Sequence, residues 1–284
     1  MSELPTFAIR VTDLSRSIAF YRDRIGFTLV ETHLDQDVAT MLDTDGDPML
    51  LAGPDAGDLK ALLAERHFIL TPGESIGFHG GDLAARSTDL LQRGVEDVRI
   101  EESRFGDRTL KVKDPDGYTL EFIAPAERSP EESVALYAQM PDELDAVLVG
   151  LSLSDFDLSK EADSWSISYI VHHLADGELI YLEGMLAALS TPGLKQTPYI
   201  TGGNDATSKN LRYAQRPIEP SLTLFRAVHD YFTGLGRHIP DAWERYTVSD
   251  GERKASFGEL IAYSIRHSAE HIEEIYEIRR IHGK

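Results

Sequence analysis

The stretch Leu260-Ile-Ala-Tyr-Ser-Ile-Arg-His-Ser-Ala-Glu-His-Ile-Glu-Glu-Ile275 has the apolar spacing of an amphipathic helix. His267 and His271 are four residues apart, so both imidazoles project from one side of that helix, about one turn apart. They lie at or beside the apolar stripe, whose members are Ile261, Ile265, Ile272 and Ile275. The stretch therefore predicts a bundle helix with two histidines directed inward.

Two inward histidines need polar partners, because an unsatisfied buried polar group costs about 1–3 kcal/mol. A divalent metal would satisfy both, and a third ligand should then come from another helix. The segment Val171-His-His-Leu-Ala-Asp176 offers His172 and His173, and periodicity leaves both candidates open. The alternatives are a histidine pair that is solvated or merely packed, and a pH-dependent histidine switch. No other feature of the sequence indicates a switch.

The composition restricts the chemistry and the partners. The 284 residues include no cysteine, so a disulfide, a thiolate nucleophile and a Cys-ligated zinc are excluded, and a metal must bind His, Asp or Glu. The net charge is −20, and residues 1–130 and 131–284 each carry 14 basic and 24 acidic groups. This field disfavours nucleic acid and anionic membranes as partners. With no signal-peptide pattern and no long apolar run, we expect a cytoplasmic protein.

The first 125 residues contain one order of predicted elements twice. The first copy has strands at 7–11, 28–33, 38–42 and 48–51 and a helix between Asp13 and Gly26. The second has strands at 75–79, 98–102, 109–112 and 118–123 and a helix at 83–92 capped by Asp82. Both copies are βαβββ, so we predict an α+β domain of paired βαβββ modules. The intervening segment 54–73, with a short helix around 59–66, is longer than a connector requires and is a candidate part of a binding mouth.

The segment Ala124-Pro-Ala-Glu-Arg-Ser-Pro-Glu-Glu132 separates mixed from purely helical periodicity. We therefore predict domains at 1–127 and 128–284. The second domain has predicted helices at 133–149, 165–189 (capped by Ser164), 220–235 and 257–281. Four long helices favour an all-α four-helix bundle. The connection 190–219 is rich in Pro, Gly, Thr and Asn, which favours a crossover or lid over a tight hairpin.

Two segments of the helical half form a recognisable pattern, Trp165-Ser-Ile-Ser-Tyr-Ile-Val-His-His-Leu-Ala-Asp-Gly-Glu178 and His267-Ser-Ala-Glu-His-Ile272. Residues 131–284 therefore resemble the DinB/YfiT-like superfamily. Three segments between the two also match the family in order and spacing: 219–226, 241–245 and 255–260. In that family the histidine of the His-Leu-Ala-Asp element joins the two of the final helix around zinc or nickel. The resemblance thus implies a metal site of His173, His267 and His271.

Three neutral imidazoles that leave coordination positions open are typical of a catalytic metal site, at which water or a thiol is activated. The catalytic residues themselves stay unassigned. Asp176, Glu178 and Glu270 are candidates to orient an imidazole or to shuttle a proton. Alternatively, they are ordinary charged residues on a solvated helix face.

The first domain has its own pattern in Val11-Thr-Asp-Leu14, Phe20-Tyr-Arg-Asp-Arg-Ile-Gly-Phe27 and Asp114-Pro-Asp-Gly-Tyr-Thr-Leu-Glu-Phe122. Together with the double βαβββ order, these segments make residues 5–125 resemble the glyoxalase/bleomycin-resistance (vicinal oxygen chelate, VOC) superfamily. Asp114-Pro-Asp-Gly117 is expected to be a structural turn. At the positions where metal-using members have ligands, this chain has Thr6, Ser75 and Glu121, and His79 lies four residues away. Only Glu121 is a good ligand, so we expect no metal in this domain.

Without a metal, the resemblance implies that this domain binds a small molecule in a cleft of its concave sheet. Four aromatic residues are candidates for the cleft wall or, alternatively, for the core: Phe7, Phe78, Phe105 and Tyr118. Metal-free members commonly pair two copies, which implies a homodimer.

The two resemblances together imply a metal-dependent enzyme of the thiol S-transferase or hydrolase type. It would act on a small electrophilic molecule, in detoxification or resistance, with a low-molecular-weight thiol as a candidate partner. The alternative is a non-catalytic protein that sequesters a drug or toxin and carries a structural metal. A third hypothesis makes the first domain a metal-dependent lyase or dioxygenase.

Overall fold

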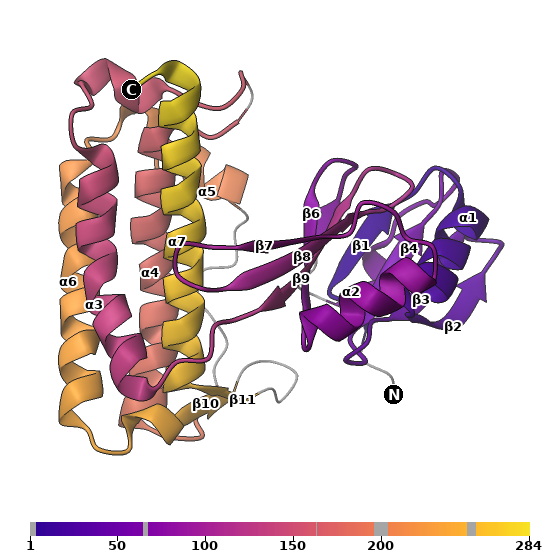
Figure 1. Cartoon of the computed structure of the whole chain (residues 1–284), viewed down its shortest axis with the longest axis horizontal. Coiled ribbons are helices and arrows are strands. Elements are labelled where there is room, and N and C mark those ends of the chain that lie inside the picture. The colour runs from indigo at the N-terminus through magenta and orange to yellow at the C-terminus, as the bar shows by residue number, and fades with distance from the viewer. Residues whose placement is uncertain (1–3, 65–67, 163, 196–203, 249–253) are drawn as a thin grey trace. The chain divides into compact units, whose positions relative to one another are not determined.

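Residues 4–64, 68–162, 164–195, 204–248 and 254–284 are described by the structure, a computed structural model. Contacts between residues divide the chain into two units, Met1–Ala126 and Glu127–Lys284. The first unit combines sheets and short helices, and the second is built around long helices (Figure 1). This is the fold class that the sequence predicts.

The first βαβββ copy forms a sheet with the strand order β2-β3-β4-β1-β5. Strands β1 and β4 pair in parallel, and β5, which was not predicted, adds a parallel edge next to β1. The elements are β1 (Phe7–Arg10), α1 (Leu14–Ala19), a π-helix (Phe20–Ile25), β2 (Thr28–His33), β3 (Val38–Leu42), β4 (Pro48–Ala52) and β5 (Phe68–Leu70).

The second copy repeats this arrangement with the strand order β6-β9-β8-β7. Here β6 and β9 are the parallel pair, at the places that β1 and β4 take in the first sheet. The elements are β6 (Ser75–His79), α2 (Leu83–Gln92), β7 (Arg99–Glu102), β8 (Arg108–Lys113) and β9 (Thr119–Ala124). The predicted internal repeat is therefore confirmed.

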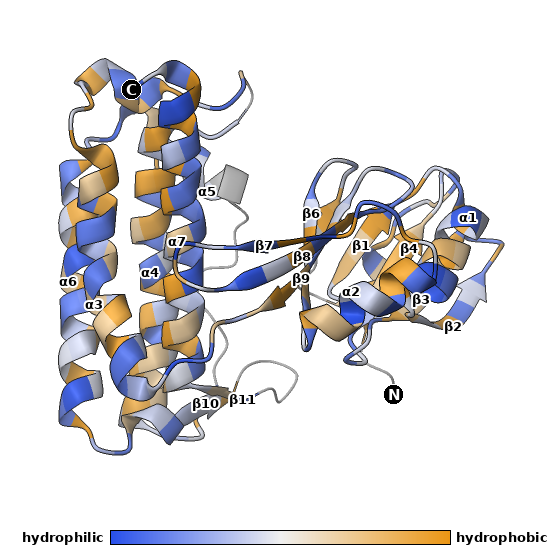
Figure 2. Cartoon of the chain, viewed as in Figure 1, coloured by the Kyte–Doolittle hydropathy of each residue, from blue (hydrophilic) through white to orange (hydrophobic). Residues whose placement is uncertain are grey.

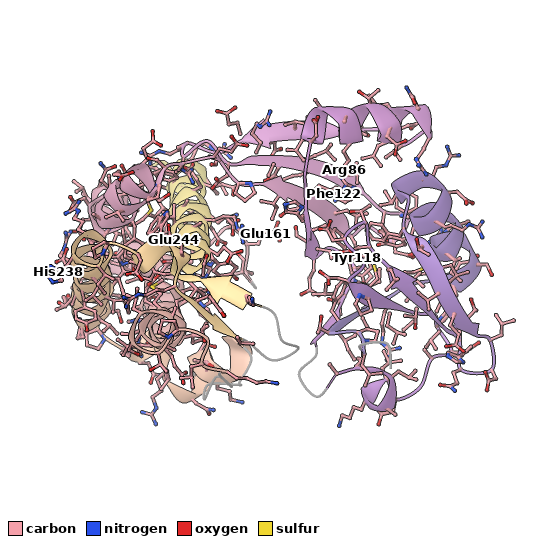
Figure 3. The ribbon with its side chains drawn as sticks, turned by 90° about the horizontal axis from the view of Figure 1, so that it is seen from below. Arg86, Tyr118, Phe122, Glu161, His238 and Glu244 are labelled. Carbon is pink, nitrogen blue, oxygen red and sulfur yellow. The ribbon has the colours of Figure 1, made fainter. Side chains whose placement is uncertain are left out.

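Local signals explain where the two short helices begin and end. The Asp13 carboxylate accepts a hydrogen bond from the Arg16 N–H, and Asp82 accepts from Ala84 and Ala85, so both predicted N-caps are present. The π-helix that extends α1 ends at Gly26, whose φ of 90° few other residues tolerate. On α2, the Arg86 guanidinium lies 4.4 Å from the ring centre of Phe122 (Figure 3).

The insertion between the copies covers one face of the first sheet. Its side chains Ala56, Leu59 and Leu63 are buried together with apolar residues of β1, β3 and β4. The helix expected at 59–66 is present as one 3₁₀ turn, Lys60–Leu62, while residues 65 and 66 lie outside the described ranges. Burial of a leucine side chain contributes about 1.5–3 kcal/mol, so Leu59 and Leu63 hold the insertion against the sheet.

Four helices make up the bundle of the second unit, and their N-terminal caps follow from the sequence. Ser129 and Ser256 each form a capping box with the glutamate three residues later, and Ser166 caps the second long helix. The predicted cap Ser164 is therefore wrong by two residues. The helices are α3 (Pro130–Leu148), α4 (Ile167–Ser190), α6 (Glu219–His238) and α7 (Phe257–His282).

Helices α3 and α7 run in one direction and α4 and α6 in the other (Figure 1). The connection from α4 to α6 therefore returns along the bundle as a crossover, which contains α5 (Asn204–Asn210). At the far end, β10 (Tyr246–Val248) and β11 (Lys254–Ser256) form a hairpin that leads into α7. The side of α7 seen in Figure 2 is largely hydrophilic, whereas α4 has apolar residues along its length. None of the described helices is long and apolar enough to cross a membrane.

Candidate metal centre

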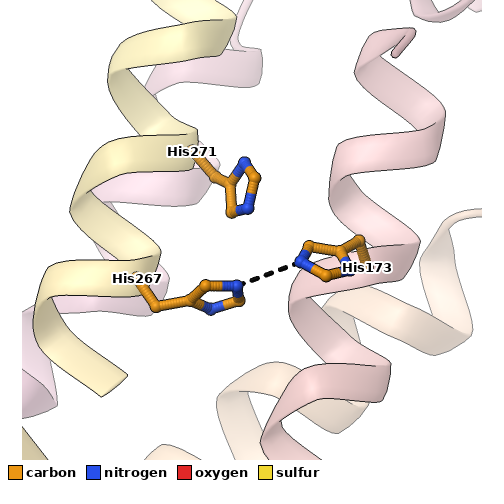
Figure 4. A group of neighbouring side chains, drawn as sticks. All are labelled: His173, His267 and His271. Atoms are coloured by element: carbon orange, nitrogen blue, oxygen red, sulfur yellow. Dashed lines mark hydrogen bonds between the residues drawn. The ribbon is translucent and has the colours of Figure 1, made fainter. Parts of the chain in front are cut away.

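The structure brings together the side chains of His173, His267 and His271 (Figure 4). His173 comes from the second turn of α4, and the other two lie on successive turns of α7, which packs against α4. The Nε2 atoms of His173 and His267 are 3.0 Å apart, and one nitrogen from each of the three rings lies within 4.8 Å of the other two. The three imidazoles thus converge on one point between two helices.

The histidines lie at the edge of the bundle core, as the helical periodicity requires. Ile265 and Ile272, which flank them on α7, are fully buried, whereas the histidines are partly buried. Gly177 of α4 makes room for His267, because a Cβ atom at this position would lie 3.3 Å from His267 Cε1. A glycine in the middle of α4 costs about 0.5–1 kcal/mol relative to alanine. Here it permits close approach of an imidazole.

Burial and mutual repulsion keep two of the rings neutral. Burial, followed by the neighbouring His271, lowers the pKa of His173 to about 4. Burial, followed by both other histidines, lowers the pKa of His267 to about 2. Neutral imidazoles have a free nitrogen lone pair, which is the form that binds a metal. At neutral pH these two side chains are therefore available as ligands without the loss of a proton.

The donor set and its spacing fit a tetrahedral divalent ion. Zn–N bonds of about 2.0–2.1 Å at the tetrahedral angle place two ligand nitrogens about 3.4 Å apart. The Nε2 atoms of His173 and His267 are 3.0 Å apart, and all three nitrogens lie within 4.8 Å of one another, so their spacing is close to that value. With no cysteine in the chain, a nitrogen-rich site favours zinc or nickel over calcium and magnesium, which prefer oxygen.

Glu274 is a functional candidate that the sequence analysis missed. Its Oε2 atom lies 3.1 Å from Nδ1 of His271. Since a carboxylate only accepts, Nδ1 donates, and Nε2 of His271 is left free for a metal. Burial acts to raise the pKa of Glu274, but the hydrogen bond from His271 and the charges nearby hold it below its usual value. The three-residue spacing from His271 was the available signal.

Aromatic rings surround the three imidazoles. The Trp165 ring is stacked on His271 with centroids 5.6 Å apart, and it lies edge-on to His173 at 4.7 Å. Tyr181 and Tyr263 flank His267 at centroid distances of 5.7 and 6.4 Å. These rings limit the rotation of the imidazoles and give the surroundings of the cluster an apolar character.

His172, the other member of the doublet, is directed elsewhere. Its ring is fully buried, with Nδ1 2.8 Å from the Ser221 hydroxyl and Nε2 3.0 Å from the Arg216 carbonyl oxygen. Both ring nitrogens are therefore engaged by the start of α6 and the end of the crossover. His172 holds the crossover against α4 and takes no part in the cluster.

The three acidic candidates differ in their surroundings. Asp176 accepts hydrogen bonds from the Tyr213 hydroxyl at 2.6 Å and from the Arg216 guanidinium at 3.2 Å, so it fixes the crossover. Glu270, with a side chain 60 % exposed, lies 3.8 Å from Arg266 and is a surface residue. Glu178 is completely buried. Glu270 thus fits the solvated alternative, Asp176 is half-buried in a hydrogen-bond network, and Glu178 is the one of the three that is removed from water.

In the first unit, Lys111 lies beside the carboxylate that matches the family's metal ligand. Glu121 is 3.6 Å from Lys111 Nζ and accepts a hydrogen bond from the Ser75 hydroxyl at 3.3 Å. His79 is turned toward Asp45 at 3.5 Å, and Thr6 is exposed. A lysine next to the only good ligand repels a cation, so the residues present do not fit a metal here.

Close to this ion pair lies a pocket of about 730 Å³ with charged walls. Its walls include Arg99, Glu101, Lys111 and Glu121 from β7, β8 and β9. The aromatic residues considered for the wall lie elsewhere: Phe78 and Tyr118 are buried in the core, and Phe7 packs against it. For these residues the alternative of core aromatics is correct, and Phe105 does not line this pocket either.

Comparison with known families identifies both units. Residues 136–275 match the DinB superfamily, and residues 3–122 match the Glyoxalase/Bleomycin resistance protein/Dioxygenase superfamily. The two matches do not overlap, and each lies within one structural unit. The two-domain fusion that the sequence pattern implies is thus confirmed.

Known relatives of the chain have related names. A protein of Geobacillus thermodenitrificans, named "Putative metal-dependent hydrolase", is 27% identical over 169 residues, which cover 57% of this chain and 92% of the relative. A Bacillus pumilus protein of the same name is 24% identical over 168 residues, covering 57% and 93%. The solved structure of YfiT from Bacillus subtilis, described as a probable metal-dependent hydrolase with an unusual four-helix bundle topology, has a TM-score of 0.50. It is 22% identical and covers 56% of this chain and 93% of that one.

Proposed function

Because the chain joins a glyoxalase/bleomycin-resistance superfamily domain to a DinB superfamily domain, we propose that it is a metal-dependent enzyme. In this proposal His173, His267 and His271 hold one zinc or nickel ion, and the reaction is attack by water or a low-molecular-weight thiol on a small electrophile. Relatives named as metal-dependent hydrolases support the hydrolytic form.

The observation that supports the proposal best is the convergence of three imidazoles, two of them held neutral, without a fourth protein ligand. Among the described residues, only these three form a group of potential ligands within 4.8 Å. Structural zinc sites usually have four protein ligands, whereas catalytic sites keep a position open. A bound ion would supply a Lewis acid and lower the pKa of the water or thiol that attacks.

The chain's own side chains position the reactants. The His271–Glu274 hydrogen bond fixes the proton on Nδ1 and thereby orients the ring. Trp165, Tyr181 and Tyr263 give the cluster apolar walls, which reduce access of bulk water and offer contact area to an apolar substrate. This arrangement suits a small substrate with an uncharged, electrophilic carbon.

The first domain is proposed to bind a small ligand without a metal, in the pocket beside Lys111 and Glu121. Its cations and carboxylates are balanced, which favours a polar or zwitterionic ligand over a purely apolar one. We further propose a homodimer, a role in detoxification or resistance, and a cytoplasmic location.

Turnover by the zinc- and nickel-loaded full chain tests the proposal. The substrates are a panel of activated esters, for hydrolysis, and of electrophiles offered with cellular thiols. Metal-dependent turnover that is lost in His271→Ala and retained in Glu121→Ala supports the enzyme. Ligand binding without metal-dependent turnover would favour the alternative, a protein that sequesters a drug or toxin.

A further inference from the structure

Glu178 is a fully buried carboxylate in the centre of the four-helix bundle. It extends from α4 between α3 and α7, where Ser264 Oγ donates to Oε1 at 2.6 Å and the Tyr137 hydroxyl lies 3.4 Å from Oε2. All three side chains have no exposed surface. The bundle core therefore contains a polar layer of three buried side chains.

Two neutral hydroxyl groups do not compensate for a buried carboxylate, which can accept about four hydrogen bonds. Within the described ranges, no lysine, arginine or histidine pairs with Glu178. Burial raises the pKa of Glu178 to about 7, because the charged form lacks a counter-charge. Burying a charge without a partner is strongly unfavourable, so a residue of this kind usually has a partner or a function.

His267 also has a polar atom that lacks a hydrogen-bond partner. Its Nδ1 atom is buried and has no hydrogen-bond partner. If Nε2 binds a metal, Nδ1 carries a proton and needs an acceptor, which at His271 is Glu274. Gly177, the residue before Glu178, approaches the His267 ring, and Ser264 lies one turn before His267 on α7. Glu178 is thus linked to the surroundings of His267 on both helices, by its chain neighbour Gly177 on α4 and by its hydrogen-bond partner Ser264 on α7.

We propose that Glu178 is a positioning residue of the metal centre. Its carboxylate accepts the Nδ1 proton of His267, directly or through one buried water, and serves as the buried counter-charge of the bound cation. This inference rests on the proposed three-histidine site. It gives the two metal-binding histidines of α7 one carboxylate each, Glu274 for His271 and Glu178 for His267.

The test compares the full chain with Glu178→Gln, which keeps the shape and removes the charge. Zinc affinity is measured by competition with a chromophoric chelator, and melting temperatures are recorded with and without zinc. We expect Glu178→Gln to bind zinc about 10–100-fold more weakly, the usual effect of losing an outer-sphere carboxylate. Its metal-free form should melt at the same or a higher temperature, because an uncompensated buried acid is gone.

Glu270→Gln is the matched control, since it removes the same charge next to His271 but from an exposed side chain. Its zinc affinity should stay within about 2-fold of the wild type, because solvent and salt screen that charge. Equal effects of the two variants would overturn the proposal in favour of a general charge effect. So would an unchanged zinc affinity of Glu178→Gln with a lowered melting temperature, which indicates a structural role.

Ser264→Ala keeps the proposal testable if Glu178→Gln does not fold. It removes the 2.6 Å hydrogen bond that holds the carboxylate, and it should weaken zinc binding several-fold. An unchanged affinity would overturn the proposal. A wild-type chain that binds no zinc would contradict the three-histidine site itself, whereas normal wild-type binding with unaffected variants would contradict only the role of Glu178.

Discussion

Nδ1 of His271 lies 3.1 Å from Oε2 of Glu274, one turn later on the same helix. This hydrogen bond determines which nitrogen of His271 carries the proton and directs the other toward His173 and His267. The same carboxylate lies 3.8 Å from Lys160, which pairs more closely with Glu277 at 2.6 Å. Glu274 thus links the histidine cluster to a cation on the bundle surface.

Replacing Glu274 should weaken metal binding without disrupting the helix. In Glu274→Gln the amide is a poorer acceptor for the Nδ1 proton, so we expect about a 10–100-fold loss of zinc affinity. Chelator competition measures it. Glu277→Gln is the control, because Glu277 also pairs with Lys160 but, among the described residues, is not hydrogen-bonded to a histidine as Glu274 is. Similar affinities of the two variants would show that the His271–Glu274 bond does not support the site.

Gly177→Ala should separate helix stability from site geometry. An alanine normally stabilises a helix interior by about 0.5–1 kcal/mol relative to glycine. At position 177 the new Cβ would press on His267, whereas a Cβ at Gly234 of α6 would have no described neighbour within 4 Å apart from its own helix backbone. Chemical denaturation should show the full gain for Gly234→Ala and a smaller gain or a loss for Gly177→Ala. Zinc affinity should fall only in Gly177→Ala, and a loss in both would be inconsistent with this geometry.

The metal-free chain should lose stability on acidification through the buried histidines. Since the folded pKa of His267 is lowered to about 2, the unfolded chain, with an ordinary value near 6.5, binds more protons below that pH. Such a group lowers the free energy of unfolding by up to about 1.4 kcal/mol per pH unit. Glu178 has the opposite effect on stability. Because its pKa is raised, the folded chain binds more protons than the unfolded chain between about pH 4.5 and about pH 7, and acidification through this range stabilises the fold.

A comparison with His267→Gln isolates the histidine from Glu178, which both chains contain. Urea unfolding at pH 6 and pH 5 should show a steeper loss of stability for the wild type than for the variant. Equal pH slopes would mean that His267 is protonated equally in the folded and unfolded states.

The pair of Lys111 and Glu121 predicts that the first domain contributes no metal ligand. Glu121→Ala should leave the zinc content of the full chain unchanged, because the wild-type carboxylate is occupied by Lys111 and Ser75. Metal analysis after dialysis checks this. A fall in zinc content in Glu121→Ala would indicate that a metal competes successfully with the lysine.

Much of the fold is encoded locally and was predictable for that reason. Helix α2 has the predicted bounds, because its signals follow one another directly in the sequence. Asp82 caps it, residues 83–92 are amphipathic, and Gly94 ends it. Strand β5 was missed because its three residues pair in parallel with β1, a contact distant in sequence. The cap of α4 was placed at Ser164 instead of Ser166, because both are serines that precede the helix at a suitable distance.

The site was only partly predictable. Periodicity placed His267 and His271 on one face but could not choose between His172 and His173, which differ by about 100° around a helix. The choice depends on tertiary partners, since Ser221 and Arg216 of distant segments engage His172. The burial of Glu178 also depends on packing, because Ser264 and Tyr137 lie on other helices.

The metal content of the purified full chain tests the central claim most directly. Mass spectrometric metal analysis should find about one zinc or nickel ion per chain in the wild type and in His172→Gln, because the His172 side chain lies outside the cluster. It should find none in His267→Ala. A wild-type chain that folds and turns over substrate without metal, or a His267→Ala variant that keeps its metal, would contradict a three-histidine metal centre.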